Sequence, residues 1–444
     1  MTESSGSEAG RRIAKNTGLM FGGKGTGAVL NVLVLVVVGR HLPTEVFGSL
    51  LIIHATMLAF AELGTFKSWQ ALIKFGVPHL SSGDTPALHR LIRFSLGLDI
   101  VSAMFAFLAA ELFLWFGHHL IGLDAAYRDL AMAYCFLILA RQRFTAIGTL
   151  RLLDRFDLLA LHATAMPAAR LVGSIIAAFS GGGLQAFVLV WAIAAVFDYI
   201  VLWYFTGREL YRADLLKGLF DRLPTLKAPE TGLWRFSWTA NIDSTIAVAK
   251  QELPLLLAGG VLGAAYAAVF KVAVQIASVL VKGTQQLDEV IYPELAHMIN
   301  QGQAHRIWPL ILRAAGILVA IAMGVGLIVA ILGPDVLSWA LQTDYRLSAP
   351  LATLLLFAGA ISAAYAPLLP TLYAADRPEH ALLARGVGVS TLLVLFVVLA
   401  HTVGELGPGI AFIIGDTLAL IFAAALTQRA LRNVVSNAKT GTSP

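Results

Sequence analysis

Long apolar segments separated by short polar connections dominate the chain. A helix needs roughly 20 mostly apolar residues to cross about 30 Å of hydrocarbon, and scanning for such runs gives twelve candidate spans. Their approximate limits are 17–39, 45–65, 95–116, 126–147, 158–180, 184–206, 234–256, 262–283, 308–332, 349–373, 381–402 and 407–428. The pattern predicts an all-α polytopic membrane protein with twelve transmembrane helices.

Composition strengthens this prediction and excludes most soluble classes. Of 444 residues, 58% are hydrophobic and only 13% are charged, whereas soluble domains carry about 25% charged residues. The single cysteine, Cys135, lies in an apolar run, so neither a disulfide framework nor a thiolate metal cluster is expected. The first span is long and lacks a small-residue cleavage site, so we expect it to be a retained helix rather than a signal peptide.

The distribution of positive charge predicts the orientation. Cytoplasmic loops are enriched in Lys and Arg, and most of the 32 residues of these two types fall on one side of the predicted membrane. Only three connections on the opposite side carry one, at Arg40, Arg128 and Arg346. The asymmetry predicts cytoplasmic N- and C-termini. It also attributes the net charge of +5 to topology rather than to a nucleic-acid partner.

A basic connection that contains prolines divides the spans into six and six. We therefore predict an N-terminal tail, two six-helix bundles joined by a cytoplasmic linker, and a C-terminal tail. The respective limits are 1–14, 15–206, 207–231, 232–430 and 431–444. The segment Thr149–Phe156, after the fourth span, is similar to Thr371–Pro378, after the tenth. This similarity predicts parallel repeats about an axis along the membrane normal, an architecture of alternating-access carriers.

No motif for covalent chemistry occurs in the chain. A phosphate-binding GxxxxGK[ST] loop, the metalloprotease HExxH and the hydrolase GxSxG are all missing from the sequence. The doublet His118-His119 has no third ligand at helical spacing, so it does not indicate a metal site. We expect a protein that is not an enzyme and needs no metal or cofactor.

Ionisable residues inside the predicted spans are the candidate functional residues. Each costs about 2.5–3.5 kcal/mol at a helix centre and therefore usually faces a protein interior or a wet cavity. Asn31 shares a helix face with one of the cations, and Gln275 lies four residues after another. The candidate substrate-binding residues are Lys24, Asn31, Arg170, Lys250, Lys271 and Gln275.

The sign of these charges indicates the ligand. Lys and Arg side chains hold phosphate or pyrophosphate by charge-assisted hydrogen bonds, whereas a hydrophobic cation would be repelled. Structural alternatives stay open, because Lys24 and Lys250 can extend to an interface and Arg170 can pair with Asp198.

Acidic residues within the spans are candidates for coupling to a proton or sodium ion. Asp243 lies seven residues before Lys250, and Asp416 lies near mid-depth of the last span. Glu62 and Asp99 are instead expected at the cytoplasmic interface.

Four passages resemble a known family. They are Gly39–Gly48, Gly259–Tyr266, Ile291–Ala296 and Leu372–Pro378. In this order they are similar to the polysaccharide transporter branch of the multidrug/oligosaccharidyl-lipid/polysaccharide exporters, and the chain looks like an O-antigen or exopolysaccharide repeat-unit flippase. The family often has Gly where this chain has Asp376.

The resemblance implies a fold, a substrate and partners. It implies a V-shaped pair of six-helix bundles, as in the related multidrug exporters, that moves an undecaprenyl-pyrophosphate-linked oligosaccharide from the inner to the outer leaflet. Partners would be this polyprenyl-diphosphate glycan, the lipid bilayer, and a polysaccharide polymerase with other assembly proteins. Cations on the first and eighth helices bind substrate in lipid II flippases, and Lys24 and Lys271 lie on the corresponding helices here.

Three other functions are weighed against a flippase. A drug or metabolite antiporter of the same superfamily is the main rival, and it should have a deep acidic site and few buried cations. A glycan polymerase or ligase would need large extracytoplasmic loops, but the predicted loops are short. A purely structural membrane protein would have no use for four cations in its spans.

Overall fold

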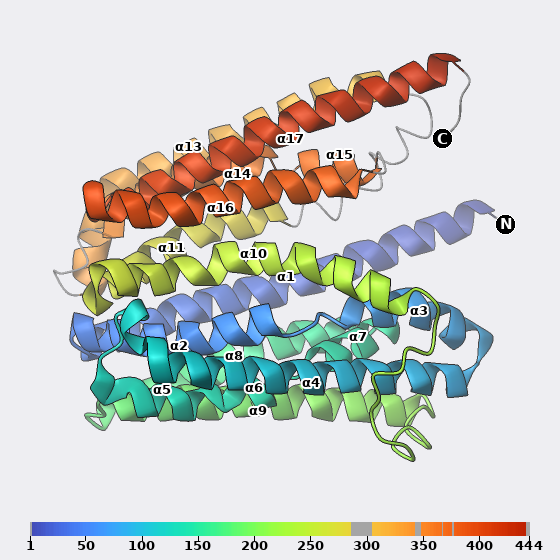
Figure 1. The fold of residues 1–444 in the computed structure, drawn as a ribbon, viewed down its shortest axis with the longest axis horizontal. Helices are drawn as coiled ribbons and strands as arrows, with labels where there is room; N and C mark the ends of the chain where they lie inside the picture. Colours follow the sequence, from blue (N-terminus) through green and yellow to red (C-terminus); the bar gives the residue numbers. More distant parts are fainter. Residues whose placement is uncertain (1, 286–303, 342–347, 366, 375–376, 441–444) are drawn as a thin grey trace. The chain divides into compact units, whose positions relative to one another are not determined.

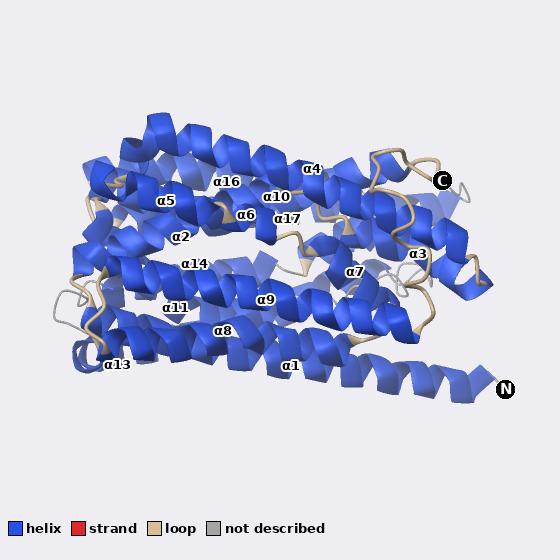
Figure 2. Cartoon of the chain, turned by 90° about the horizontal axis from the view of Figure 1, so that it is seen from below, coloured by secondary structure: helices blue, strands red, loops and turns tan. Residues whose placement is uncertain are grey.

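The described part of the chain is helical throughout. The structure, a computed structural model, describes residues 2–285, 304–341, 348–365, 367–374 and 377–440. Helices and loops, without a strand, make up these residues (Figures 1 and 2). Ten helical segments are long and apolar enough to cross a membrane, and two shorter apolar helices, Gly25–His41 and Ala264–Ser278, accompany them. The prediction of an all-α multi-pass membrane protein is confirmed, and the count of twelve spans stays a prediction.

The helices form two compact units, which we describe separately. Unit 1 comprises Met1–His119 and Leu123–Val248, and unit 2 comprises Leu120–Gly122 and Ala249–Pro444. The division falls inside one long helix rather than in the predicted linker 207–231, so the predicted limits of the two bundles stay a prediction. The similar passage Ile291–Ala296 lies outside the described residues.

Unit 1 holds the first nine helices and the first half of the tenth, coloured blue to green in Figure 1. Their bounds are α1 Thr2–His41, α2 Thr44–Gly64, α3 Trp69–Ser82, α4 Thr85–Gly117, α5 Arg128–Cys135, α6 Leu137–Ala140, α7 Phe144–Leu152, α8 Phe156–Phe179, α9 Leu184–Arg212 and α10 Leu233–Leu262. The third span begins earlier than predicted, because Asp84 caps α4 by accepting a hydrogen bond from the Ala87 amide at 3.0 Å. The fourth predicted span is divided into α5, α6 and α7.

Unit 2 holds the second half of α10 and the remaining described helices. Their bounds are α11 Ala264–Gln285, α13 Ala304–Ala340, α14 Ser348–Tyr365, α15 Leu368–Ala374, α16 Pro378–Thr402 and α17 Gly407–Thr440. Part of the predicted C-terminal tail is therefore helical. In unit 1, α8 packs against α9 and α2 against α5; in unit 2, α16 packs against α17 and α11 against α14. These two pairs correspond in the predicted repeat, but α1 also packs against α8 without a counterpart among the described contacts of unit 2, so the repeat stays a prediction.

Close contact between α1 and α8 depends on two glycines. A Cβ atom at Gly27 would lie 2.9 Å from the carbonyl oxygen of Ala163, and one at Gly23 would collide with the carbonyl of Ala160. Gly25, between them, has open space around it. The spacing of four residues is the small-xxx-small pattern that lets membrane helices approach closely, so the glycine-rich stretch serves packing in unit 1.

Asp99 joins two interruptions of the helices. The break between α2 and α3 ends at Ser68, whose hydroxyl donates to Asp99 Oδ1 at 2.7 Å. The break before α7 leaves the Thr145 amide without a helical partner, and it donates to Asp99 Oδ2 at 2.8 Å. Asp99 is 2% exposed. It is therefore a buried acceptor that joins the residue before α3 to the first turn of α7, and its predicted place at the cytoplasmic interface stays a prediction.

Alanine substitutions at Gly23 and Gly25 test the packing of α1. We expect Gly23→Ala to lower the free energy of unfolding by about 1–3 kcal/mol, because the new methyl group overlaps the α8 backbone. Gly25→Ala, the control, should be neutral or stabilise by up to about 1 kcal/mol through helix propensity. Thermal unfolding of the purified protein in detergent measures both, and equal effects would contradict the proposed contact.

Asparagine substitutions test the role of Asp99. In Asp99→Asn one carboxylate oxygen becomes an amide nitrogen, so either Ser68 or Thr145 loses its acceptor. We expect a loss of about 1–3 kcal/mol, the cost of an unpaired buried donor. Asp84→Asn is the matched control, because Asn and Asp cap exposed helix starts about equally well. If both variants unfold at the same temperature, the hydrogen bonds from Ser68 and Thr145 to Asp99 do not stabilise the fold.

Candidate functional site

Arg170 lies in the middle of α8 and is buried in unit 1. The residue is 6% exposed. Its Nη1 lies 3.5 Å from His54 Nε2, and its Nη2 lies 3.8 Å from Met166 Sδ. Arg170 lies nine residues before Phe179, the last residue of α8, which is about 14 Å along the helix axis. The charge is therefore far from both ends of this helix.

Aromatic rings surround the guanidinium. Arg170 Cζ lies 4.4 Å from the centre of the Trp191 ring on α9, within the range of a cation–π interaction. The His54 ring meets Trp191 edge-on at 5.0 Å. Trp191 is itself held in place, because its Nε1–H lies 3.4 Å from Ser174 Oγ. The rings offer the charge a polarisable surface but no negative charge.

The arginine also determines how His54 is protonated. A guanidinium only donates hydrogen bonds, so His54 Nε2 is the acceptor in this pair. The proton of the neutral ring is then on Nδ1, which donates to the Tyr134 hydroxyl at 2.9 Å. A chain of hydrogen bonds thus runs from α8 through α2 to α5.

No described carboxylate lies within 4.0 Å of the Arg170 guanidinium. Asp198, the partner considered from the sequence, pairs instead with His162 Nε2 at 2.9 Å. Arg170 is therefore a buried cation without an ion pair among the described residues.

Lys250 and Asp416, predicted for different roles, form one ion pair in unit 2. Lys250 on α10 donates to the carboxylate of Asp416 on α17, and to the hydroxyl of Ser362 on α14 at 3.1 Å. Asp416 is 6% exposed, whereas the lysine is only partly buried. The positive charge of Lys250 is therefore neutralised in this conformation.

Lys271 and Gln275 share one face of α11 and are both half-buried. Among the described residues, Gln275 Nε2 is a buried donor without a hydrogen-bond partner, and Lys271 has no carboxylate within 4.0 Å. Ser278 continues this face, and its hydroxyl donates to the Gln275 carbonyl at 2.8 Å. Lys271, Gln275 and Ser278 therefore form a polar face of α11, on which the Gln275 amide group has a donor without a partner among the described residues.

For three further predicted site residues, the structure describes little or nothing of the side chain. Asn31 is half-buried on α1, and the side chains of Lys24 on α1 and Asp243 on α10 lie outside the described part of the structure. Their roles stay predictions.

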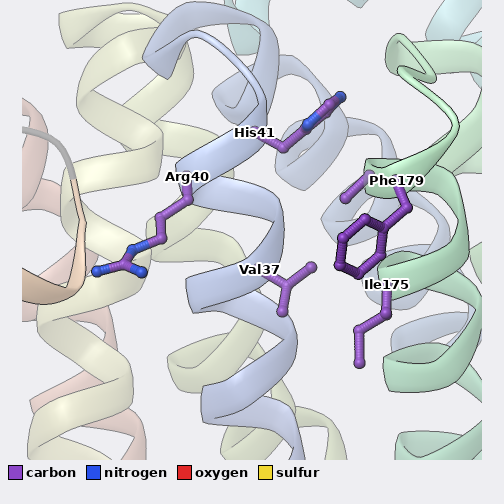
Figure 3. Close-up of a pocket in the computed structure, with 6 residues that line it drawn as sticks. Val37, Arg40, His41, Ile175 and Phe179 are labelled. Atoms are coloured by element: carbon purple, nitrogen blue, oxygen red, sulfur yellow. The ribbon is translucent and has the colours of Figure 1, made fainter.

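A groove of about 350 Å³ lies between the ends of α1 and α8. Its walls are mainly apolar, and Figure 3 shows the Arg40 side chain extending away from the Phe179 ring. His41, also on its wall, donates from Nε2 to the Gly182 carbonyl at 3.1 Å. None of the predicted substrate-binding residues lines this groove.

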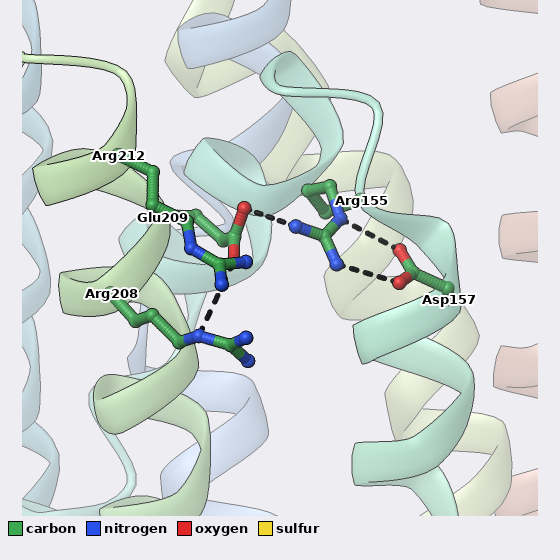
Figure 4. A network of polar contacts seen from close by, with 5 residues as sticks. All are labelled: Arg155, Asp157, Arg208, Glu209 and Arg212. Atoms are coloured by element: carbon green, nitrogen blue, oxygen red, sulfur yellow. Dashed lines mark hydrogen bonds and ion pairs between the residues drawn. The ribbon is translucent and has the colours of Figure 1, made fainter.

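A network of ion pairs connects the start of α8 with the end of α9 (Figure 4). Arg155 lies between Asp157, at 2.7 Å, and Glu209, which also contacts Arg212 at 3.2 Å. Hydrogen bonds to Asp157 and Glu209 raise the pKa of Arg155 above its ordinary value. These arginines, which the sequence assigns to topology, also stabilise the packing of unit 1.

Sequence reasoning missed the neighbours of the predicted cations. His54, Tyr134, Trp191 and Ser362 complete the two clusters. A signal existed for His54, since it is the only ionisable residue between Glu45 and Glu62 in an otherwise apolar run. Ser362 and Tyr134 give no comparable signal in the sequence.

Removing one partner of the Lys250–Asp416 pair tests its contribution. Asp416→Asn leaves a partly buried ammonium without its counter-charge, and we expect a loss of about 1–3 kcal/mol in the free energy of unfolding. Adding Lys250→Gln should recover part of this loss. Glu379→Gln breaks an exposed pair with Arg377 and should cost less than about 1 kcal/mol. Thermal unfolding compares the variants, and equal losses for Asp416→Asn and Glu379→Gln would contradict this assignment.

Comparisons with known proteins place the chain in a family. The family described as polysaccharide biosynthesis protein matches residues 13–298. The chain is 29% identical over 339 residues to the inner membrane protein YghQ of Escherichia coli strain K12, covering 76% of this chain and 94% of the relative.

Solved structures share the fold. An inward-facing multidrug resistance MATE family transporter of the MOP superfamily superposes with a TM-score of 0.76 at 14% identity, covering 92% of this chain and 95% of that one. The lipid II flippase MurJ, in its inward closed conformation, superposes with a TM-score of 0.70 at 10% identity, covering 93% and 88%. The predicted superfamily fold is confirmed, and the fold is that of transporters rather than enzymes. The chain belongs to the polysaccharide biosynthesis protein family and has the helical fold of the multidrug/oligosaccharidyl-lipid/polysaccharide exporters.

Proposed function

We propose that this protein is a flippase of the inner membrane that moves an undecaprenyl-pyrophosphate-linked oligosaccharide repeat unit from the inner to the outer leaflet by alternating access. The observation that carries the proposal is the family match over residues 13–298. The fold shared with a lipid II flippase and the inner-membrane relative support it. We further propose that both termini are cytoplasmic, and that a polysaccharide polymerase and other assembly proteins act on the product.

The diphosphate is the part of this substrate that the cations can recognise. On unit 2, Lys271 and Gln275 offer donors that no described residue uses, so they are the first proposed ligands. Lys24 and Asn31 on α1 are the proposed ligands from unit 1. Arg170 adds positive charge at mid-span, although its burial means that substrate contact requires α2, α5, α8 and α9 to rearrange.

Lys250 can bind a phosphate of the substrate only if it releases the Asp416 carboxylate. Its ammonium is bound to Asp416 and Ser362, so a phosphate must replace the carboxylate. The buried Asp416 carboxylate would then lose its counter-charge, which is energetically costly. We therefore propose Asp416 as the coupling residue for this exchange, with Asp243 as a second candidate.

A drug or metabolite antiporter is the alternative function. It is favoured by one observation, the buried Asp416 carboxylate in a fold that superposes on a multidrug transporter with a TM-score of 0.76. The Lys250 partner argues against it, because an ammonium beside the carboxylate opposes the binding of an organic cation.

Gene deletion followed by lipid extraction tests the proposed function. Loss of the protein should cause undecaprenyl-linked glycan to accumulate on the cytoplasmic face and should deplete surface polysaccharide. Complementation with Lys271→Ala should restore little, because a charged hydrogen bond is worth about 1.5–3 kcal/mol, or about 10- to 100-fold in affinity. Lys227→Ala, at an exposed position in the linker, is the matched control and should restore wild-type levels.

Two outcomes would contradict the flippase. Normal surface polysaccharide in the deletion strain is the first. Sensitivity of that strain to cationic drugs, with no accumulation of lipid-linked glycan, is the second and would favour the antiporter.

A further inference from the structure

The guanidinium of Arg170 makes far fewer hydrogen bonds than its chemistry allows. An arginine carries five N–H donors. Here Nη1 has one contact of 3.5 Å and Nη2 one contact of 3.8 Å to sulfur, both long for hydrogen bonds. Nε is buried and has no partner among the described residues. A 6% exposed residue cannot meet this demand from bulk water.

The charge is as poorly compensated as the donors. The described contacts of the guanidinium are with the side chains of His54, Met166 and Trp191, none of which is acidic. No described carboxylate lies within ion-pair distance, and Asp198 is engaged by His162. Burying an ion without a counter-charge is costly, so this place in unit 1 favours an anion.

Tyr134 supplies a further donor. Its hydroxyl lies 2.9 Å from His54 Nδ1. In the tautomer in which Nδ1 donates, the Tyr134 proton is left for another acceptor. Tyr134 is 3% exposed, so the unused donor is buried as well.

We propose that Arg170, together with the His54–Tyr134 pair and Trp191, forms a binding site for a small inorganic anion of the halide class inside unit 1. The helices that surround Arg170 limit the size of the ligand. Helices α2, α5, α8 and α9 supply all the contacting side chains, and the arginine is almost wholly covered. Such close covering limits the ligand to a small anion, because a diphosphate attached to a lipid and a glycan does not enter while these helices stay together.

This site does not depend on the proposed flippase function. It requires only the buried charge and the unused donors of unit 1. During transport the same guanidinium can exchange the inorganic anion for a phosphate, but the anion site exists without the glycolipid. Its test therefore uses no lipid-linked substrate.

The test compares the thermal unfolding of the purified full-length protein in sodium chloride and in sodium gluconate at equal ionic strength. An anion that binds only the folded state stabilises it by mass action, and we expect chloride to raise the unfolding temperature by about 2–4 °C. Arg170→Gln should abolish this difference. Arg212→Gln, a largely exposed arginine of the same unit, is the matched control and should retain it.

A direct measurement covers the case in which Arg170→Gln fails to fold. Crystals of the wild-type protein grown in bromide should show an anomalous peak within about 3.5 Å of the Arg170 guanidinium nitrogens. The proposal is overturned if chloride and gluconate give the same unfolding temperature, if the difference persists in Arg170→Gln, or if bromide binds only elsewhere.

Discussion

The energetic cost of placing charge inside the hydrocarbon governs this structure. A helix can leave its apolar side chains against lipid, but a carboxylate, ammonium or guanidinium within a span must find partners inside the protein. The chain meets this constraint in three different ways. Asp99 receives hydrogen bonds from the starts of two half-helices, Lys250 and Asp416 neutralise each other, and Arg170 rests among neutral aromatic rings. Each solution leaves a different chemical capacity behind.

The three buried sites differ in whether their charged groups can exchange a protein partner for a ligand. The Asp99 carboxylate is fully used by donors of the backbone and side chains, so its role is to hold α3 and α7 in place. The Lys250–Asp416 pair has equal and opposite charges, so any anion that takes the lysine frees a carboxylate. Arg170 has both charge and donors in reserve. A carrier needs the second and third kinds of site, because it must bind its cargo and then release it.

Sequence reasoning predicted the helical class and the superfamily fold, because both depend on local composition. The rarity of charge within the predicted spans also singled out Arg170, Lys250 and Asp416, all of which the structure places at least partly inside the protein. The side chains that contact these charged residues could not be predicted from the sequence. The contact of Lys250 with Asp416 joins positions far apart in the chain, and the His162–Asp198 pair depends on helix rotation that periodicity does not fix. The interruptions at Ser68 and before α7 were missed because their stabilising carboxylate lies on a third helix.

The two hydrogen bonds that Asp99 accepts have a mechanical consequence. Because Ser68 and Thr145 bind the two oxygens of a single carboxylate, the starts of α3 and α7 keep a constant separation, and these two helices also pack against each other. A tilt of α3 away from the axis of α2 is thus shared by α7. The beginnings of α3 and α7 therefore move as one rigid unit held at Asp99, whereas α9 has no such connection to Asp99 among the described contacts.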